Sequence, residues 1–243
     1  CKRCEVACPS NVRIGDIIQS ARIKYGPQHN TSLRNFVLAN TDLVGTLATP
    51  FAPIVNTTVK LKPVRFVMDK VMAIDHRRVF PKYAHGTFTS WYRKHAAAEQ
   101  EAFPHQVAYF HGCYVNYNNP QLGKDLLRIM NALGYGVQLL DREQCCGVAL
   151  ISNGLYKQAR RQAETNLRSI RTSVKGRNMD VITTSSTCTF TLRDEYPHLL
   201  ELENADVRDH IELATRYIYR LLQRGDMQLK FKDTTPLRVA YHT

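Results

Sequence analysis

From Val107 onward, short apolar segments alternate with amphipathic helical segments, and this alternation limits the fold more than any other feature of the chain. Strands that alternate with helices pair in parallel, with the helices covering the faces of the sheet. The sequence therefore predicts an α/β fold with a parallel sheet over residues 106–236. The expected strands are 107–113, 137–140 and 179–188, and the expected helices are 120–133, 153–174 and 208–224.

Each of the three expected strands is followed by cysteine: Cys113 after the first, Cys145 and Cys146 after the second, and Cys188 after the third. The carboxyl ends of neighbouring parallel strands share one edge of a sheet, so four sulfur atoms should meet there. Free cysteines are also common as buried structural residues. Gly147, directly after the adjacent pair, favours a metal site, because glycine lets a bulky inorganic centre approach the backbone.

The spacing of these cysteines, C-x31-CC-x41-C, differs from the paired C-x2-C and C…H spacings of structural zinc sites. Seven cysteines, two of them adjacent, are also atypical of a secreted disulfide framework and favour a metal site in a reducing compartment. His111 lies two residues before the first of these cysteines. It is interpreted as a packing residue or a hydrogen-bond partner of the centre, with a catalytic Cys–His pair as the alternative.

The chain begins with three cysteines, Cys1, Cys4 and Cys8, followed by Pro9. Bacterial ferredoxins carry C-x2-C-x2-C-x3-C-P, in which the last cysteine ligates the second cluster of a two-cluster fold. The three cysteines are therefore predicted to ligate [4Fe–4S] clusters whose other ligands precede residue 1. Residues 1–30 are interpreted as the C-terminal part of a ferredoxin-type domain, with a helix that starts near Ile14 and stops at Gly26.

The last residues repeat the first expected strand: Val239–Tyr241 matches Val107–Tyr109. A recurrence at a corresponding structural position is typical of an internal repeat. Residues 237–243 are therefore predicted to be the first strand of a second cysteine-rich repeat. The coding sequence should then contain a cysteine soon after Thr243 and another three positions before Cys1.

Residues 31–105 are predicted to form a helical connector. Its segment 43–59 carries no charge but is interrupted by two prolines and is shorter than the roughly 20 apolar residues of a membrane span. Two interpretations stay open: a broken helix packed inside the protein, or a contact with the membrane interface. The following segment, 64–72, has the periodicity of an amphipathic helix, and its methionine-rich face is expected to join the core.

The net charge of +12 indicates a partner with negative charge. Nucleic acid is disfavoured, because no helix-turn-helix, RNP or zinc-finger spacing is present and the basic residues alternate with acidic ones. An anionic membrane surface fits better, through Lys60, Lys62 and Arg65 beside the apolar segment. The chain also lacks the G-x-G-x-x-G fingerprint of dinucleotide-binding enzymes.

The pattern C-x31-CC-G followed by "SSTC" resembles the cysteine-rich CCG module of heterodisulfide reductase and of the iron–sulfur subunits of glycolate and glycerol-3-phosphate dehydrogenases. Over nearly the whole chain, "DLVGTLATPFAPIVN", "IDHRRVFPKYAHGTF", "VNYNNPQLGKDLLRIMNALG" and "LRDEYPHLL" resemble the family of anaerobic glycerol-3-phosphate dehydrogenase C subunits. One position departs from the module, which usually ends C-x2-C. Ser185 stands where the first cysteine of that pair would be, and a serine oxygen is a poor replacement for thiolate on iron.

The resemblance implies an electron-transfer subunit with no catalytic residue of its own. In that family, two ferredoxin-type [4Fe–4S] clusters precede two CCG modules. The subunit accepts electrons from flavin-bearing dehydrogenase subunits under anaerobic conditions and passes them to the quinone pool. The flavin belongs to the partner subunits, and attachment is expected to be peripheral, on the cytoplasmic face of the bacterial inner membrane.

Three alternatives remain. A CCG protein can itself act as a heterodisulfide or thiol reductase, or serve as the iron–sulfur subunit of a glycolate or lactate oxidase complex. The third is a scaffold without redox activity that holds zinc and binds partners. In the preferred interpretation the metal ligands are Cys1, Cys4 and Cys8 for the ferredoxin-type clusters, with Cys113, Cys145, Cys146 and Cys188 for a CCG-type iron–sulfur centre.

Overall fold

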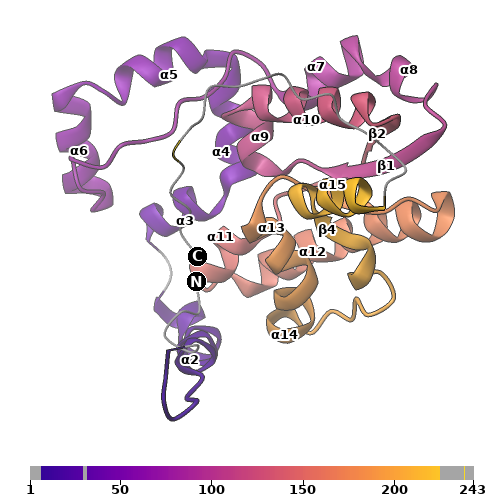
Figure 1. Cartoon of the computed structure of the whole chain (residues 1–243). Coiled ribbons are helices and arrows are strands. Elements are labelled where there is room, and N and C mark those ends of the chain that lie inside the picture. Colours follow the sequence, from indigo (N-terminus) through magenta and orange to yellow (C-terminus); the bar gives the residue numbers. More distant parts are fainter. Residues whose placement is uncertain (1–6, 30–31, 225–237, 239–243) are drawn as a thin grey trace.

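A computed structural model describes residues 7–29, 32–224 and 238 of the chain. In this part the strands form one four-stranded parallel sheet in the order β2-β1-β3-β4. This confirms the predicted α/β class with a parallel sheet (Figure 1). The strands are β1 (His105–Phe110), β2 (Tyr135–Leu139), β3 (Val181–Thr183) and β4 (Ile211–Leu213).

Helices cover both faces of this sheet and create two separate hydrophobic cores. One core lies under α7 (Phe88–His95), α9 (Gly112–Tyr117), α10 (Pro120–Ala132) and α15 (Ala214–Gln223). The other lies under α11 (Val148–Ser152), α12 (Tyr156–Arg171), α13 (Ser186–Phe190) and α14 (Tyr196–Leu200), with π-helical turns at η2 (Thr172–Gly176) and η3 (Thr191–Glu195).

Strand β1 shows why its sequence is apolar without alternation. Val107 and Tyr109 belong to the core under α10, whereas Ala108 and Phe110 belong to the core under α12. All four side chains are fully buried. A strand that is covered on both faces needs apolar residues at every position, which is typical of a parallel sheet.

The last part of the predicted helical connector, directly before the sheet, contributes to the core. Phe88 and Tyr92 of α7 are buried in the core under α10. The Tyr92 hydroxyl donates to the Val137 carbonyl at 2.7 Å, and Gln100, at the end of α8 (Ala97–Gln100), accepts from the Val137 N–H at 3.0 Å. Helices α7 and α8 are therefore anchored to β2 through its backbone.

Several expected elements differ from the structure: the first strand, for example, ends at Phe110, three residues before its predicted end. The third strand ends at Thr183, because the chain turns there and Ser185 caps the following helix α13. The segment 208–224 is not one helix: it begins with the 3-10 turn η4 (Arg208–His210) and strand β4, and becomes helical at Ala214. Pairing of Ile211 with Val181 adds β4 to the sheet and buries the isoleucine, which local helix periodicity could not indicate.

The N-terminal helix α2 (Ile14–His29) continues three residues beyond the predicted stop at Gly26. It contacts the helices below the sheet: the Tyr156 hydroxyl donates to Gln19 Oε1 at 2.7 Å, and Arg22 donates to the Ser152 carbonyl at 3.1 Å. The described part of the N-terminal segment is therefore bound to α11 and α12.

Before α7, the described residues of the connector form five short helical elements: α3 (Leu33–Ala39), α4 (Thr41–Ala48), η1 (Thr49–Phe51), α5 (Ala52–Thr58) and α6 (Lys62–Met72). From η1 to α6 the connector projects away from the sheet (Figure 1). No helix in the described ranges is long and apolar enough to cross a membrane.

The interpretation that segment 43–59 forms a broken helix packed inside the protein is wrong for the large side chains of this segment. Leu47, Phe51 and Ile54 are 64%, 61% and 63% exposed, and only small residues of this stretch, such as Gly45 and Ala52, are buried. Helix α6 has no buried residue at all, so its apolar face does not join the core either. The described residues of this region therefore form an exposed apolar surface.

Candidate metal centre at the cysteine loops

The structure brings four of the predicted cysteines together at the carboxyl edge of the sheet. Cys113 lies on α9 directly after β1, and its sulfur is 3.7 Å from the sulfur of Cys145 in the loop after β2. Cys146 contacts the thiols of both Cys145 and Cys188, the latter on α13 after β3. The connection from β1 to β2 runs over the face covered by α10, and the connection from β2 to β3 runs over the opposite face, covered by α12. The cysteines therefore lie at a topological switch point, where open α/β sheets bind ligands.

The four thiols form a row of neighbouring pairs, from Cys113 through Cys145 and Cys146 to Cys188. Within residues 7–29, 32–224 and 238, no group of three or more His, Cys, Asp or Glu side chains is arranged to hold one metal ion. A mononuclear site needs its donors around one centre, whereas an iron–sulfur cluster is held by four cysteine thiolates. Because four cysteine sulfurs are the usual ligand set of such a cluster, the chemistry of these side chains fits an iron–sulfur centre.

Two glycines let the loops approach each other here. Gly112 has a φ of 72°, and a Cβ added to it would lie 3.4 Å from the Cys188 sulfur. Gly147, directly after the adjacent cysteines, has a φ of 90° and would place a Cβ 3.7 Å from Ala159 of α12. Both φ values lie in the left-handed region, where side chains other than glycine are strained.

Hydrogen bonds among the thiols lower the pKa of two of them and raise the pKa of the other two. Bonds from Cys113 and Cys146 lower the pKa of Cys145 well below the usual thiol value, and a bond from Cys146 lowers the pKa of Cys188. The pKa values of Cys113 and Cys146 are raised by those same bonds. Thiolate is the form that binds metal, and metal binding releases the protons that remain.

A buried carboxyl group holds the backbone just before Cys113. Glu143 accepts hydrogen bonds from the N–H groups of His111 at 3.1 Å and of Gly112 at 2.6 Å. Burial raises the pKa of Glu143 well above its usual range. Sequence reasoning missed this residue, although an acidic residue two positions before a cysteine pair, in the loop after a strand, was a usable signal.

His111 is buried behind the cysteines. Its Nδ1 atom lies 3.0 Å from the Gly112 carbonyl and 3.2 Å from a Glu143 oxygen, and its Nε2 atom lies 3.3 Å from the Thr89 hydroxyl. Burial lowers its pKa to about 4, so the ring is neutral at pH 7. The ring also packs edge-on against Phe88 and Tyr109, which supports the packing interpretation over a catalytic one.

Asn166 of α12 holds the backbone of the loop that carries the adjacent cysteines. Its amide N–H donates to the carbonyls of Gln144 and Cys145, both at 3.2 Å, and its Oδ1 atom accepts from the Gln144 N–H at 2.8 Å. The Tyr196 hydroxyl donates to the Cys146 carbonyl at 3.1 Å. The sequence signal was a polar residue on the apolar face of an amphipathic helix, since Asn166 is buried beside Leu167.

Helix α4 of the connector contacts the loop that carries Cys145. Asp42 Oδ2 accepts a hydrogen bond from the Cys145 N–H at 2.5 Å. Burial, followed by the nearby Cys145 thiol, raises the pKa of Asp42 to about 6. The site therefore draws one of its contacts from a helix more than 100 residues earlier in the sequence.

The remaining predicted site residues lie elsewhere or outside the described ranges. Cys1 and Cys4 are outside the residues that the structure describes. Cys8 precedes α2, where its sulfur accepts from the Val12 N–H at 3.4 Å. The Ser185 hydroxyl accepts from the Cys188 N–H at 3.4 Å and caps α13, so it has a structural role in positioning Cys188.

The cysteine loops belong to a known domain type. Residues 107–193 match the family model described as CCG, a cysteine-rich domain. The C subunit of anaerobic glycerol-3-phosphate dehydrogenase from Escherichia coli strain K12 is 60% identical over 235 residues, which are 97% of this chain and 58% of that protein. The chain is a homologue of this protein. It spans less than two thirds of the length of this curated relative.

More distant relatives match a little over half of the chain. The B subunit of fumarate reductase (CoM/CoB) from Methanothermobacter marburgensis is 30% identical over 137 residues, which are 56% of this chain and 25% of that protein. Lactate utilization protein A from Anoxybacillus flavithermus is 24% identical over 143 residues, 56% of each chain. No solved structure matches the chain.

Proposed function

We propose that the CCG domain holds an iron–sulfur centre through Cys113, Cys145, Cys146 and Cys188 and that the chain transfers electrons within an anaerobic glycerol-3-phosphate dehydrogenase complex. The observation that carries the proposal is the meeting of four sulfur donors from three separate loops at one edge of the sheet. An iron–sulfur centre supplies a site that accepts and releases electrons at a tuned potential. The relative that is 60% identical is named as the C subunit of such a dehydrogenase.

The residues around the cysteines bind and orient the cysteine loops. Glu143 and Asn166 hold the loop backbones, while the neutral His111 fills the space behind them. In the proposed relay, the alcohol of glycerol 3-phosphate is oxidised on flavin-bearing partner subunits and gives up two electrons and two protons. The electrons pass through this protein to a membrane quinone, which takes up two electrons and two protons.

The N-terminal cysteines extend the proposed relay. Cys1, Cys4 and Cys8 are proposed ligands of ferredoxin-type [4Fe–4S] clusters, completed by cysteines that precede residue 1. In the described part, α2 contacts the CCG domain through Gln19 and Arg22. These contacts support a path in which electrons move between the ferredoxin-type clusters and the CCG centre without a large rearrangement.

The choice of acceptor separates an electron relay from a thiol reductase. With the purified complex and glycerol 3-phosphate, a relay predicts rapid reduction of a soluble quinone analogue and no turnover with an organic disulfide. A reductase predicts the reverse, because its centre would cleave the disulfide directly. Steady-state rates with each acceptor under anaerobic conditions make the distinction, and turnover with the disulfide alone would contradict the proposal.

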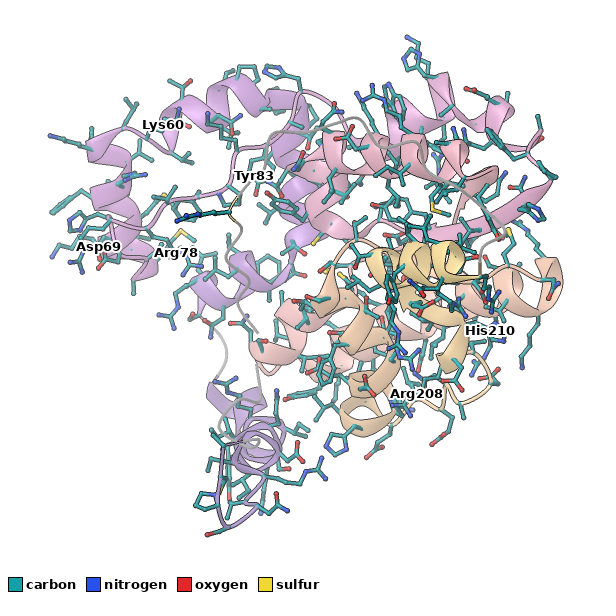
Figure 2. All side chains as sticks on the ribbon, in the orientation of Figure 1. Lys60, Asp69, Arg78, Tyr83, Arg208 and His210 are labelled. Carbon is teal, nitrogen blue, oxygen red and sulfur yellow. The ribbon has the colours of Figure 1, made fainter. Side chains whose placement is uncertain are left out.

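We also propose that the projecting connector attaches the protein to the cytoplasmic face of the bacterial inner membrane. The exposed side chains of Leu47, Phe51 and Ile54 offer apolar area that a membrane interface can bury. Lys60 lies on the same projecting part of the connector, between α5 and α6 (Figure 2). His210 lies at the far side of the molecule. Basic residues beside an apolar surface favour an anionic membrane.

Replacing Phe51 and Ile54 together by serine should weaken binding of the full-length protein to anionic vesicles by at least about tenfold, since burying one such side chain contributes roughly 1.5–3 kcal/mol. Binding of the unchanged protein should also fall as salt increases, because exposed charges are screened. Cosedimentation with vesicles measures both effects. Tyr219→Ser removes an equally exposed side chain from α15 and should bind like the unchanged protein, so equal loss in both variants would contradict this surface.

A further inference from the structure

Helix α4 lies outside the segment that matches the CCG domain, yet it is fixed directly above the cysteine loops. Asp42 binds the Cys145 N–H, and the Thr46 hydroxyl lies 3.0 Å from the Tyr117 hydroxyl of α9. A Cβ added to Gly45 would lie 2.5 Å from the Tyr117 ring, so the two helices are in close contact. The first turn of α4 therefore has a defined position relative to the four thiols.

Thr41, the first residue of α4, carries a hydroxyl group that nothing described so far explains. The Thr41 Oγ1 atom is buried and has no hydrogen-bond partner of standard geometry among the described residues. This hydroxyl lies beside the thiols of Cys113 and Cys145 and interacts with both. Most buried hydroxyl groups are paired, so an unpaired one beside two sulfur atoms indicates a missing acceptor.

A ligating thiolate is the acceptor that fits this position. An ionised acceptor forms a stronger and shorter hydrogen bond than a neutral one, and a thiol is only a weak acceptor. When Cys113 and Cys145 bind metal as thiolates, the Thr41 hydroxyl gains the partner that it lacks next to the thiols. The methyl group of the threonine still fills space against the site, so valine is a substitution of nearly the same shape.

We propose that Thr41 is a positioning residue that donates a hydrogen bond to the sulfur of Cys113 or Cys145 in the metal-bound site and thereby raises the reduction potential of the centre. This inference rests on the proposed iron–sulfur function of the four cysteines. Reduction adds negative charge to a cluster and its sulfur ligands, and a hydrogen bond to sulfur stabilises that charge. Such bonds are among the factors that set the potentials of iron–sulfur proteins.

The test compares Thr41→Val with Thr41→Ser in the intact complex by redox titration, following the iron–sulfur signals by low-temperature electron paramagnetic resonance (EPR). Thr41→Val should make the potential of one centre more negative by an amount on the order of 59 mV, which is a tenfold change in the ratio of reduced to oxidised centre for one electron. Thr41→Ser keeps the hydroxyl and should titrate close to the unchanged protein. The ferredoxin-type signals should not move in either variant.

Thr49→Val is the matched control, because Thr49 in η1 also has a buried hydroxyl without a partner in the described part of the chain. It makes the same chemical change but is not among the groups that face the thiols, so the potential should stay unchanged.

Four results bear on the inference. An unaltered potential in a fully iron-loaded Thr41→Val protein would overturn it, as would equal loss of iron in the valine and serine variants. Loss of iron in the valine variant alone would support a role of the hydroxyl. Absence of any iron–sulfur signal in the unchanged complex would instead overturn the proposed function on which the inference rests.

Discussion

Cys146→Ser is expected to remove the iron–sulfur centre of the CCG domain while the chain stays folded. Cys146 is buried and contacts the thiols of both Cys145 and Cys188, so it connects the two halves of the sulfur row. A serine oxygen has nearly the same shape but is a poor ligand for iron. Iron content should fall by the amount of one cluster, and electron transfer from glycerol 3-phosphate to quinone should decrease by at least about a hundredfold.

The same loss is expected for serine at the other three cysteines, which are Cys113, Cys145 and Cys188. Ser185→Ala is the control, because Ser185 caps α13 and has no proposed ligand role. Loss of an N-cap costs about 1 kcal/mol, so this variant should be slightly less stable and keep its iron. Full iron content and normal electron transfer in Cys146→Ser would contradict the assignment of the site.

Glu143→Ala is expected to destabilise the CCG domain by about 2–5 kcal/mol, because it leaves the buried N–H groups of His111 and Gly112 without an acceptor. Each unsatisfied buried group costs about 1–3 kcal/mol. Glu143→Gln keeps one carbonyl acceptor but introduces an amide N–H beside these donors, so it should fall between the alanine variant and the unchanged protein. Urea unfolding, followed by far-UV circular dichroism, measures the differences.

The surface variant Glu164→Ala provides the comparison for this prediction. Glu164 lies on the exposed side of α12 in an ion pair with Arg160, and such a pair contributes at most about 1 kcal/mol. A loss of stability in Glu143→Ala no larger than that in Glu164→Ala would show that the buried carboxyl group does not hold the Cys113 loop.

The parallel sheet and the meeting of its cysteines could be predicted because both follow from local patterns. Apolar segments in alternation with helices determine a parallel sheet, and the sheet then places Cys113, Cys146 and Cys188 at one edge. No long-range information was needed beyond the rule that neighbouring parallel strands end together. The assignment of these cysteines as metal ligands remains a prediction that rests on their chemistry.

The parts that escaped prediction depend on contacts between residues far apart in sequence. The residues of strand β4 were expected to be helical. This prediction was wrong because their pairing with β3 depends on the sheet and not on their own periodicity. The hydrogen bond of Asp42 to Cys145 spans more than 100 residues, and Asn166 gives only a weak signal on its helix.

The exposed apolar side chains of α5 and α6 show a different limit of sequence patterns. The periodicity of segment 64–72 predicts a buried face for α6, but periodicity records only that a face is apolar. It does not say what covers that face, and Ile54 and Val71 are exposed in the described part of the chain. Whether a membrane covers this surface is therefore a question for vesicle binding and not for sequence pattern.

Low-temperature EPR of the purified intact complex, combined with iron and zinc analysis, tests the central claim most directly. The account predicts iron–sulfur signals that appear on addition of glycerol 3-phosphate, disappear on addition of quinone, and include one component that is absent from Cys146→Ser. Stoichiometric zinc without iron, or iron–sulfur signals that are the same in Cys146→Ser and in the unchanged protein, would contradict it.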